Sequence, residues 1–299
     1  MKKRKRVRIK VFEEFAAAEN LLGKAGLLDV KLPVPLDAVI EYLSKEGLEL
    51  RYYNPKEAPG PIKSIASSVD EVLVYQGKDA LLFVNESKPL TRQRFSIFHG
   101  IGHFILPEHR GLNYLKRGCT PLQPTTQKPY ERQADRFAAA LNMPPSRFRH
   151  HMALLPFGMQ TVEKLAERYS ASIESAAIHY VTLAKAPCAM VWLERDYEEH
   201  GFRVPDPHLK VRYQVSNDSF PFRIKKGTDV PVESELLWRC SQEEYLTAGE
   251  IKPEHLGLET GTNLWIDCLP YDHIGTVMAL VYPGNKEPLS VIDTSHQRV

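Results

Sequence analysis

The sequence has few cysteines, no long hydrophobic run and almost no net charge, and each shortage excludes a class of protein. The four cysteines are far apart and form no C-x-x-C pair, which argues against a disulfide framework and against a cysteine zinc site. No stretch approaches the roughly 18 apolar residues of a membrane helix. A formal net charge of +2 over 299 residues is too small to indicate a polyanionic partner for the whole molecule.

Positive charge is concentrated in the first ten residues, MKKRKRVRIK. Acidic residues follow in VFEEFAAAENLLGKAG, where a signal peptide would need an apolar run, so we expect no export and a cytoplasmic location. The simplest interpretation of residues 1–10 is a basic, solvated tail. Contact with nucleic acid or with an acidic partner is the alternative.

Periodicity predicts an α+β fold that begins with two helices and a small sheet. Residues 11–29 have apolar side chains at helical spacing, and PVPLDAVIEYLSKEG forms a second helical pattern that ends at Gly47. LELRYY is strand-like, and EVLVYQGKDALLFVNE predicts a hairpin across QGKD. Residues 91–106 form the next helical pattern, which Pro107 ends.

The second half of the chain changes from helix to strand. Residues 112–129 carry three prolines and predict a loop or flap, whereas YERQADRFAAALNMPPSRF predicts a strong helix that stops at a double proline. Two short helices around YSAS then form a helix-turn-helix-like pattern. Beyond residue 186, AMVWLE, LKVRYQV, NLWIDCL and GTVMALVYP are strand-like. We therefore predict a basic tail over 1–10, a domain over 11–150, a helical domain over 151–185 and a β-rich domain over 186–299.

The segment RFSIFHGIGHFILPEH places His99 and His103 four residues apart on a predicted helix. This spacing stacks both imidazoles on one face of the helix, at a separation that one zinc ion can bridge. A pair of histidines hydrogen-bonded within a core is the alternative. A catalytic zinc usually has three protein ligands, so the metal interpretation requires a third donor.

Two residues compete for the third position. His109 lies six residues after His103, as in metzincins, but the glycine that turns the chain back in that motif is Leu106 here. Glu131 begins the next strong helix, where its carboxylate could complete a His₂Glu set. Asp135, one turn further on, could then hold a ligand imidazole by its second nitrogen. Solvated surface carboxylates are the alternative for both acidic residues.

RQRFSIFHGIGHFIL, followed 28 residues after His103 by ERQADRFAAALNMP, resembles the paired motifs of the ImmA/IrrE metallopeptidase family. The family pattern is R-F-[ST]-x-x-H-E-[IL]-[GS]-H and then E-x-x-A-[ND]-x-F-A-A-x-L-L-M-P. The resemblance extends over the helix–sheet region before residue 90, the helical segment to about 185 and the C-terminal domain. It implies a zincin-like fold for the N-terminal domain and a GAF-like sensor fold for the C-terminal domain.

The resemblance implies a metal site formed by His99, His103 and Glu131 that holds Zn²⁺, with Mn²⁺ as the alternative. It implies a cytoplasmic protease that cleaves a helix-turn-helix repressor in a stress or mobile-element response. The sequence departs from the family where the general-base glutamate of the motif corresponds to Gly100. Glycine has no group that moves a proton, and positioned acid–base groups contribute about 10²–10⁴ in rate. We therefore expect hydrolysis to be impaired or lost.

The remaining predictions concern further site residues and partners. Tyr114 and Tyr130 are candidate donors to a developing oxyanion, with ordinary loop packing as the alternative. The second helix of the helix-turn-helix-like pattern, SIESAAIHYVTLA, has no lysine or arginine, so we expect no direct DNA binding. We also expect no membrane partner. The main alternative function is a non-catalytic zinc-binding module that sequesters a repressor or senses a small ligand; a DNA-binding regulator is a weaker one.

Overall fold

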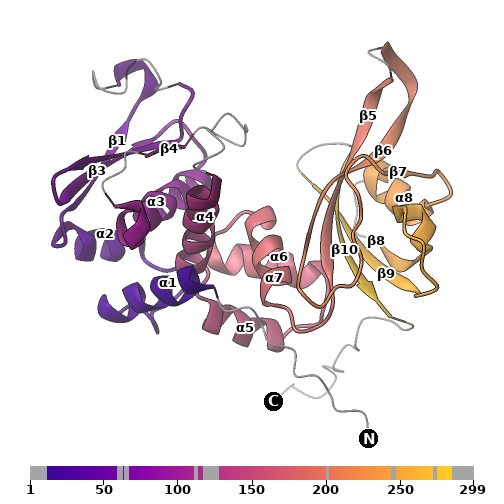
Figure 1. The fold of residues 1–299 in the computed structure, drawn as a ribbon, viewed down its shortest axis with the longest axis horizontal. Helices are drawn as coiled ribbons and strands as arrows, with labels where there is room; N and C mark the ends of the chain where they lie inside the picture. Colours follow the sequence, from indigo (N-terminus) through magenta and orange to yellow (C-terminus); the bar gives the residue numbers. More distant parts are fainter. Residues whose placement is uncertain are drawn as a thin grey trace, which may run out of the picture. The chain divides into compact units, whose positions relative to one another are not determined.

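The computed structural model describes residues 12–58, 63, 67–110, 114–116, 128–199, 202–243, 247–271 and 275–284 (Figure 1). The chain forms two compact units. The N-terminal unit combines Val11–Phe148 with Leu165–Ala176, and the C-terminal unit combines Arg149–Lys164 with Ala177–Val299. The basic tail that we predicted over residues 1–10 lies outside the described residues.

The N-terminal unit is a four-stranded sheet with helices packed against it, and with the C-terminal sheet it confirms a mixed α+β fold (Figure 1). Among the described residues, no helix is both long and apolar enough to cross a membrane. The elements in chain order are α1 (Glu13–Lys24), α2 (Leu36–Ser44), β1 (Leu48–Tyr53), η1 (Pro55–Glu57), β2 (Glu71–Gln76), β3 (Asp79–Asn85), α3 (Leu90–Ile105), η3 (Pro107–His109), β4 (Tyr114–Lys116) and α4 (Lys128–Asn142).

The sheet has the strand order β1-β3-β2-β4. β2 and β3 form the hairpin that QGKD predicts, with Gln76 opposite Asp79 and Gly77 at a φ of 68°, a backbone conformation that favours glycine. β1 runs parallel to β3, and β4 pairs antiparallel with the start of β2. The strand β4 corrects our prediction of a loop or flap over 112–129, because pairing with β2 gives Tyr114–Lys116 a strand conformation that three residues could not reveal by periodicity.

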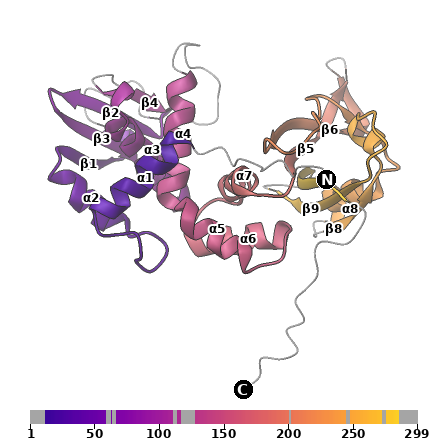
Figure 2. The ribbon, with the colours of Figure 1, turned by 60° about the horizontal axis from the view of Figure 1, so that its bottom comes forward.

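α3 and α4 carry the two predicted motifs, and they lie side by side (Figures 1 and 2). α3 packs against β2 and β3. α4 ends before the double proline, as predicted. The four α4 residues that we predicted to face inward are fully buried, namely Ala134, Phe137, Ala138 and Leu141.

Gly102 permits the close approach of these helices. A Cβ atom at this position would lie 3.2 Å from Cα of Ala134 and 3.2 Å from the ring of Phe137. Glycine within a helix costs about 1 kcal/mol relative to alanine. Here the absence of a side chain allows α4 to pack against the face of α3 that carries the histidines. Tertiary packing therefore explains why glycine occupies a position at which helix propensity disfavours it.

We expect Gly102→Ala to weaken binding of a divalent metal at this face, because the added methyl group must push the backbone of α4 outward by a few tenths of an ångström. The expected loss is near the lower end of the roughly 10–100-fold range seen when the support of a metal ligand is disturbed. Calorimetric metal titration measures it. Gly261→Ala is the control, since a Cβ atom there meets nothing within 4 Å; equal affinities for wild type and Gly102→Ala would contradict the prediction.

Three helices follow α4: α5 (Pro145–Ala153), α6 (Met159–Tyr169) and α7 (Ile173–Leu183). α6 and α7 are the two short helices predicted around YSAS, and Ser170 in their connection has a positive φ of 50°. Both helices are divided between the two units, since residues 165–176 group with the N-terminal unit. The helical domain over 151–185 and its helix-turn-helix character remain predictions.

The C-terminal unit contains a six-stranded antiparallel sheet of order β7-β6-β5-β10-β9-β8, which curls around its core (Figure 2). The four strands predicted beyond residue 186 are confirmed as β5, β6, β9 and β10. α8 packs against β8, β9 and β10 and closes the core. A GAF-like topology remains a prediction. The elements are β5 (Ala189–Glu199), β6 (Phe202–Ser216), β7 (Asp229–Val230), α8 (Glu235–Glu243), β8 (Thr247–Ile251), η4 (Pro253–Leu256), β9 (Leu264–Pro270) and β10 (Thr276–Pro283).

On the other face of this sheet, a buried carboxylate meets the N-terminus of α6. Oδ2 of Asp267 accepts a hydrogen bond of 2.7 Å from the backbone N–H of Met159, and the hydroxyl of Tyr180 accepts one of 3.3 Å from Gly158. Burial raises the pKa of Asp267 to about 6; the Met159 N–H lowers it in part, and Glu163 adds to the rise. The folded unit therefore favours the protonated acid more than the unfolded chain does.

Because the pKa of Asp267 is raised in the folded state, its contribution to stability is present below the usual value of about 4 and is lost as the pH rises through about 6. We therefore expect Asp267→Asn to raise the free energy of unfolding at pH 8 by roughly 2–3 kcal/mol. The gain should shrink towards zero by pH 4.

Tryptophan fluorescence measures this transition, because all three tryptophans, Trp192, Trp238 and Trp265, belong to the C-terminal unit. Asp218→Asn, at an exposed aspartate of the same unit, serves as the control. A stabilisation by Asp267→Asn that does not change between pH 4 and pH 8 would refute the assigned ionisation.

Candidate metal centre

The three predicted ligands meet between α3 and α4. Nε2 of His99 lies 3.3 Å from Oε2 of Glu131, and Nε2 of His103 lies 3.6 Å from Oε1 of the same carboxylate. One ligand atom from each residue lies within 4.8 Å of the other two. The imidazoles are 1% exposed and the Glu131 side chain is 13% exposed, so the histidines form the buried wall of the site and Glu131 the more accessible one.

This spacing fits a divalent ion. Four-coordinate zinc has bonds of about 2.0–2.2 Å to nitrogen and oxygen, which places neighbouring ligand atoms roughly 3.3–3.6 Å apart. The two nitrogen–oxygen distances lie in that range. Two imidazoles and one carboxylate are also a donor set that zinc accepts. The residues therefore fit a divalent metal ion of the kind that the motifs predict.

Glu71, at the start of β2, is a site residue that the sequence did not reveal. Its Oε1 lies 2.6 Å from Nδ1 of His99, and both side chains are almost fully buried. A carboxylate cannot donate here when ionised, so His99 donates through Nδ1 and directs the lone pair of Nε2 towards Glu131. In the sequence, Glu71 can be noticed only as an acidic residue at the start of the apolar strand EVLVYQ.

Asp135 does not occupy the position that we predicted for it. We expected its carboxylate to hold the second nitrogen of a ligand imidazole, but Glu71 lies at Nδ1 of His99 instead. Oδ1 of Asp135 lies 3.5 Å from Nε2 of His99, on the ligand side, and its side chain is 49% exposed. Helix geometry explains the difference, because a residue one turn after Glu131 faces the same side of α4 as Glu131.

His109 lies beside the site and contacts the predicted ligand His103 at Nδ1, the ring nitrogen that does not lie near Glu131. Its Nδ1 lies 2.8 Å from Nδ1 of His103, and its Nε2 lies 3.1 Å from Oε1 of Gln133. The short helix η3 makes the reversal for which we considered a glycine necessary. His109 is fully buried, and this burial lowers its pKa. This geometry favours Glu131 over His109 as the third ligand.

The side chain of Leu82, from β3, packs against Gly100, the position at which the family pattern has its general base. A Cβ atom on Gly100 would lie 2.4 Å from Cδ1 and 2.9 Å from Cδ2 of Leu82, a fully buried residue of β3. Two carbon atoms cannot approach so closely, so any side chain at position 100 requires Leu82 to move. The core of this unit is packed around the glycine.

The two tyrosines that we predicted as oxyanion donors lie on different elements, Tyr130 on α4 and Tyr114 on β4. The ring of Tyr130 packs edge-on against the ring of His109, with centroids 4.9 Å apart. Tyr114 lies in β4, but its side chain is outside the described residues. The oxyanion role of both therefore stays a prediction.

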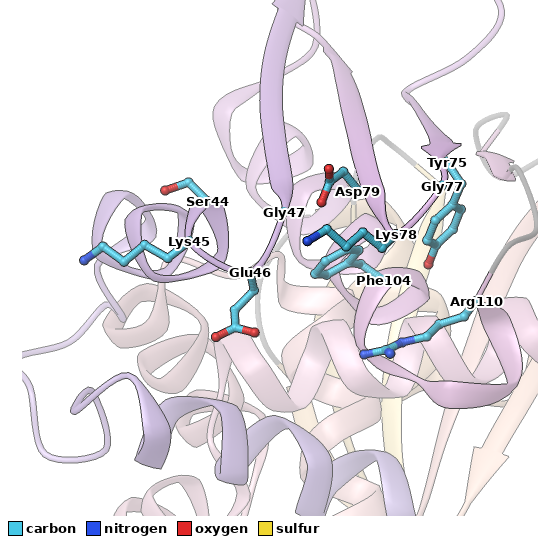
Figure 3. Close-up of a pocket in the computed structure, with 10 residues that line it drawn as sticks. All are labelled: Ser44, Lys45, Glu46, Gly47, Tyr75, Gly77, Lys78, Asp79, Phe104 and Arg110. Atoms are coloured by element: carbon cyan, nitrogen blue, oxygen red, sulfur yellow. The ribbon is translucent and has the colours of Figure 1, made fainter.

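A cavity of about 650 Å³ lies beside the C-terminal end of α3, among the end of α2, the β2–β3 turn and the residue after η3 (Figure 3). The side chains of Arg110 and Glu46 point towards the same space, whereas Lys45 points away (Figure 3). None of the three predicted ligands lines it. The hydroxyl of Tyr75, a lining residue, donates a 2.9 Å hydrogen bond to the backbone carbonyl of His103, so the cavity wall supports the histidine helix.

Residues 61–179 match a protein family described as Peptidase_M78, IrrE N-terminal-like domain. This range contains α3, α4 and all three candidate ligands. We assign residues 61–179 to the Peptidase_M78 family. The resemblance drawn from the paired motifs is thereby confirmed, and the M78 domain of this chain departs from the family pattern at Gly100.

A solved structure supports the fold of the chain as a whole. It is described as a Mycobacterium tuberculosis transcriptional regulator; the match covers 91% of this chain and 76% of that chain, with a TM-score of 0.55 and 12% sequence identity. At this identity the likeness concerns the fold alone. No curated protein sequence matches the chain.

Proposed function

We propose that this chain is a metal-binding protein of the M78 peptidase type that recognises a helix-turn-helix transcriptional repressor, with peptide-bond hydrolysis impaired or lost. The observation that carries the proposal is the convergence of His99, His103 and Glu131 on one point of an M78 domain. We propose zinc as the ion, with manganese as the alternative, and the cytoplasm as the location.

The chain keeps the residues that would bind a metal and lacks the residue that would use it. A bound divalent ion polarises a peptide carbonyl and activates water. His99 and His103 would hold the ion through Nε2, and Glu131 through its carboxylate. Position 100 has no group to take a proton from the attacking water or to deliver it to the leaving amine, a deficit worth about 10²–10⁴ in rate.

The proposed partner rests on the ImmA/IrrE resemblance and on the fold likeness to a protein described as a transcriptional regulator. α7 has no lysine or arginine, although a recognition helix in a DNA groove needs cationic side chains near the phosphates. We therefore propose that this chain binds the repressor protein and does not contact DNA directly.

A non-catalytic role is the second candidate, and one observation favours it. Leu82 packs against Gly100, so any side chain at this position, a glutamate included, requires the side chain of Leu82 to shift. A domain in this state would act by holding its partner, with the metal ion stabilising the binding surface.

The experiment combines the purified chain, zinc or manganese, and a panel of helix-turn-helix repressors. Mass spectrometry follows cleavage products, and size-exclusion chromatography follows complexes. We expect a complex with one repressor and little or no product. Efficient cleavage by the wild-type chain would remove the impaired-activity part of the proposal, and failure to bind or cleave any repressor would remove the partner. Glu131→Gln is the matched control for dependence on the metal.

A further inference from the structure

We propose that His109 and Gln133 fix His103 in the tautomer that a metal ligand requires, which makes both of them positioning residues of the metal centre. Nδ1 of His103 lies 2.8 Å from Nδ1 of His109, and Nε2 of His109 lies 3.1 Å from Oε1 of Gln133. This inference rests on the proposed binding of a metal by His103, and it gives a role to two residues that the motifs do not explain.

The side chains of His103, His109 and Gln133 are hydrogen-bonded in series, and the positions of their protons follow from Gln133. The amide oxygen of Gln133 accepts hydrogen bonds and has no proton to donate, so Nε2 of His109 carries the hydrogen. A neutral imidazole has one protonated nitrogen, so Nδ1 of His109 is an acceptor. Nδ1 of His103 must then donate, and its Nε2 keeps the lone pair that points towards Glu131, 3.6 Å away.

Because these side chains are buried, the loss of one of their hydrogen bonds costs free energy. His103 is 1% exposed and His109 is fully buried. The ring of Tyr130 covers His109 edge-on. A buried polar group that loses its partner bears the cost of desolvation, because water does not reach it easily. The three side chains therefore hold one pattern of donors and acceptors.

The two predicted ligand histidines are held in the same tautomer by different hydrogen-bond partners. His99 donates through Nδ1 to the carboxylate of Glu71 at 2.6 Å. His103 donates to a neutral imidazole backed by a neutral amide, which fixes its tautomer without placing a second buried carboxylate behind the ligands. Both Nε2 lone pairs thus face Glu131 before any ion arrives, which lowers the ordering cost of binding.

The first test reads the tautomers in the metal-free, full-length chain labelled with ¹⁵N-histidine. Long-range proton–nitrogen spectra distinguish protonated from unprotonated ring nitrogens, and His109→Phe assigns the His109 signals. We expect hydrogen on Nε2 of His109 and on Nδ1 of His103. The reverse pattern, with hydrogen on Nδ1 of His109, would overturn the proposal, since Gln133 would then present its NH₂ group and His103 could not offer Nε2 to a metal.

The second test compares Zn²⁺ affinities by competition with a chelator. Gln133→Met removes the acceptor and is expected to weaken binding about 10–100-fold, the usual effect of losing support behind a ligand. Gln133→Glu keeps an acceptor and is expected to retain most of the affinity. Wild-type affinity in a folded Gln133→Met variant would overturn the proposal.

The two tests separate this inference from the proposed function. If the wild-type chain binds no Zn²⁺, the proposed function fails, while the tautomers of the metal-free chain still decide the arrangement of His103 and His109. If Gln133→Met does not fold, the spectra of the wild-type chain alone decide the proposal.

Discussion

Replacing Glu131 by glutamine is expected to weaken Zn²⁺ binding by more than about 100-fold, because even the loss of a residue behind a ligand costs roughly 10–100-fold. The amide has the size of the carboxylate, so packing against α3 is preserved. It lacks the negative charge that lies 3.3 Å and 3.6 Å from the two imidazole nitrogens. Metal content after dialysis and chelator competition measure the effect.

Asp135→Asn is the matched control for this experiment. It removes a carboxylate from the same face of α4, one turn away, whose oxygen lies 3.5 Å from Nε2 of His99. We expect a much smaller loss of affinity than for Glu131→Gln. A larger loss in Asp135→Asn would show that the third ligand is Asp135 and that the assignment of Glu131 is wrong.

The double variant Gly100→Glu with Leu82→Ala is expected to increase peptide hydrolysis by about 10²–10⁴ over wild type, the typical contribution of a positioned acid–base group. The second substitution makes space for the new side chain, because a Cβ atom at position 100 would lie 2.4 Å from Cδ1 of Leu82. Gly100→Glu alone should be less stable, with overpacking costing about 1–3 kcal/mol, and less active than the double variant.

Leu82→Ala alone is the control, since it opens the space without supplying a base, and we expect no gain in hydrolysis. Cleavage of a bound repressor is followed by mass spectrometry, and metal content shows whether each variant keeps its ion. If the double variant folds, binds the metal and the repressor, and still cleaves no faster than wild type, the missing glutamate is not the sole deficit of the site.

The ligands were predictable because their signal is local. His99 and His103 occupy one helix face by spacing alone, and Glu131 belongs to a second motif on another strongly periodic helix. Their convergence in the structure follows from the contact between α3 and α4. The strand predictions in the C-terminal unit held for a similar reason, since short apolar runs between turn residues mark strands.

The groups behind the ligands were not predictable, because their signal lies in the packing. Glu71 lies on a strand 28 residues before His99, and no spacing rule connects a strand residue with a helix residue. Gln133 supports His103 only through His109, which the sequence offered as a competing ligand. From the sequence, Gly100 and Gly102 only lower the stability of the helix. The structure shows that Gly102 allows close contact with Ala134 and that Gly100 allows close contact with Leu82.

We infer that His99, His103 and Glu131 together hold one divalent ion. Anomalous diffraction at the zinc absorption edge, from crystals of the Zn²⁺-loaded chain, tests it most directly. We predict a single strong peak bonded to Nε2 of both histidines and to the Glu131 carboxylate. A fully loaded crystal with no peak at this point, or with the ion held by other residues, would contradict the claim.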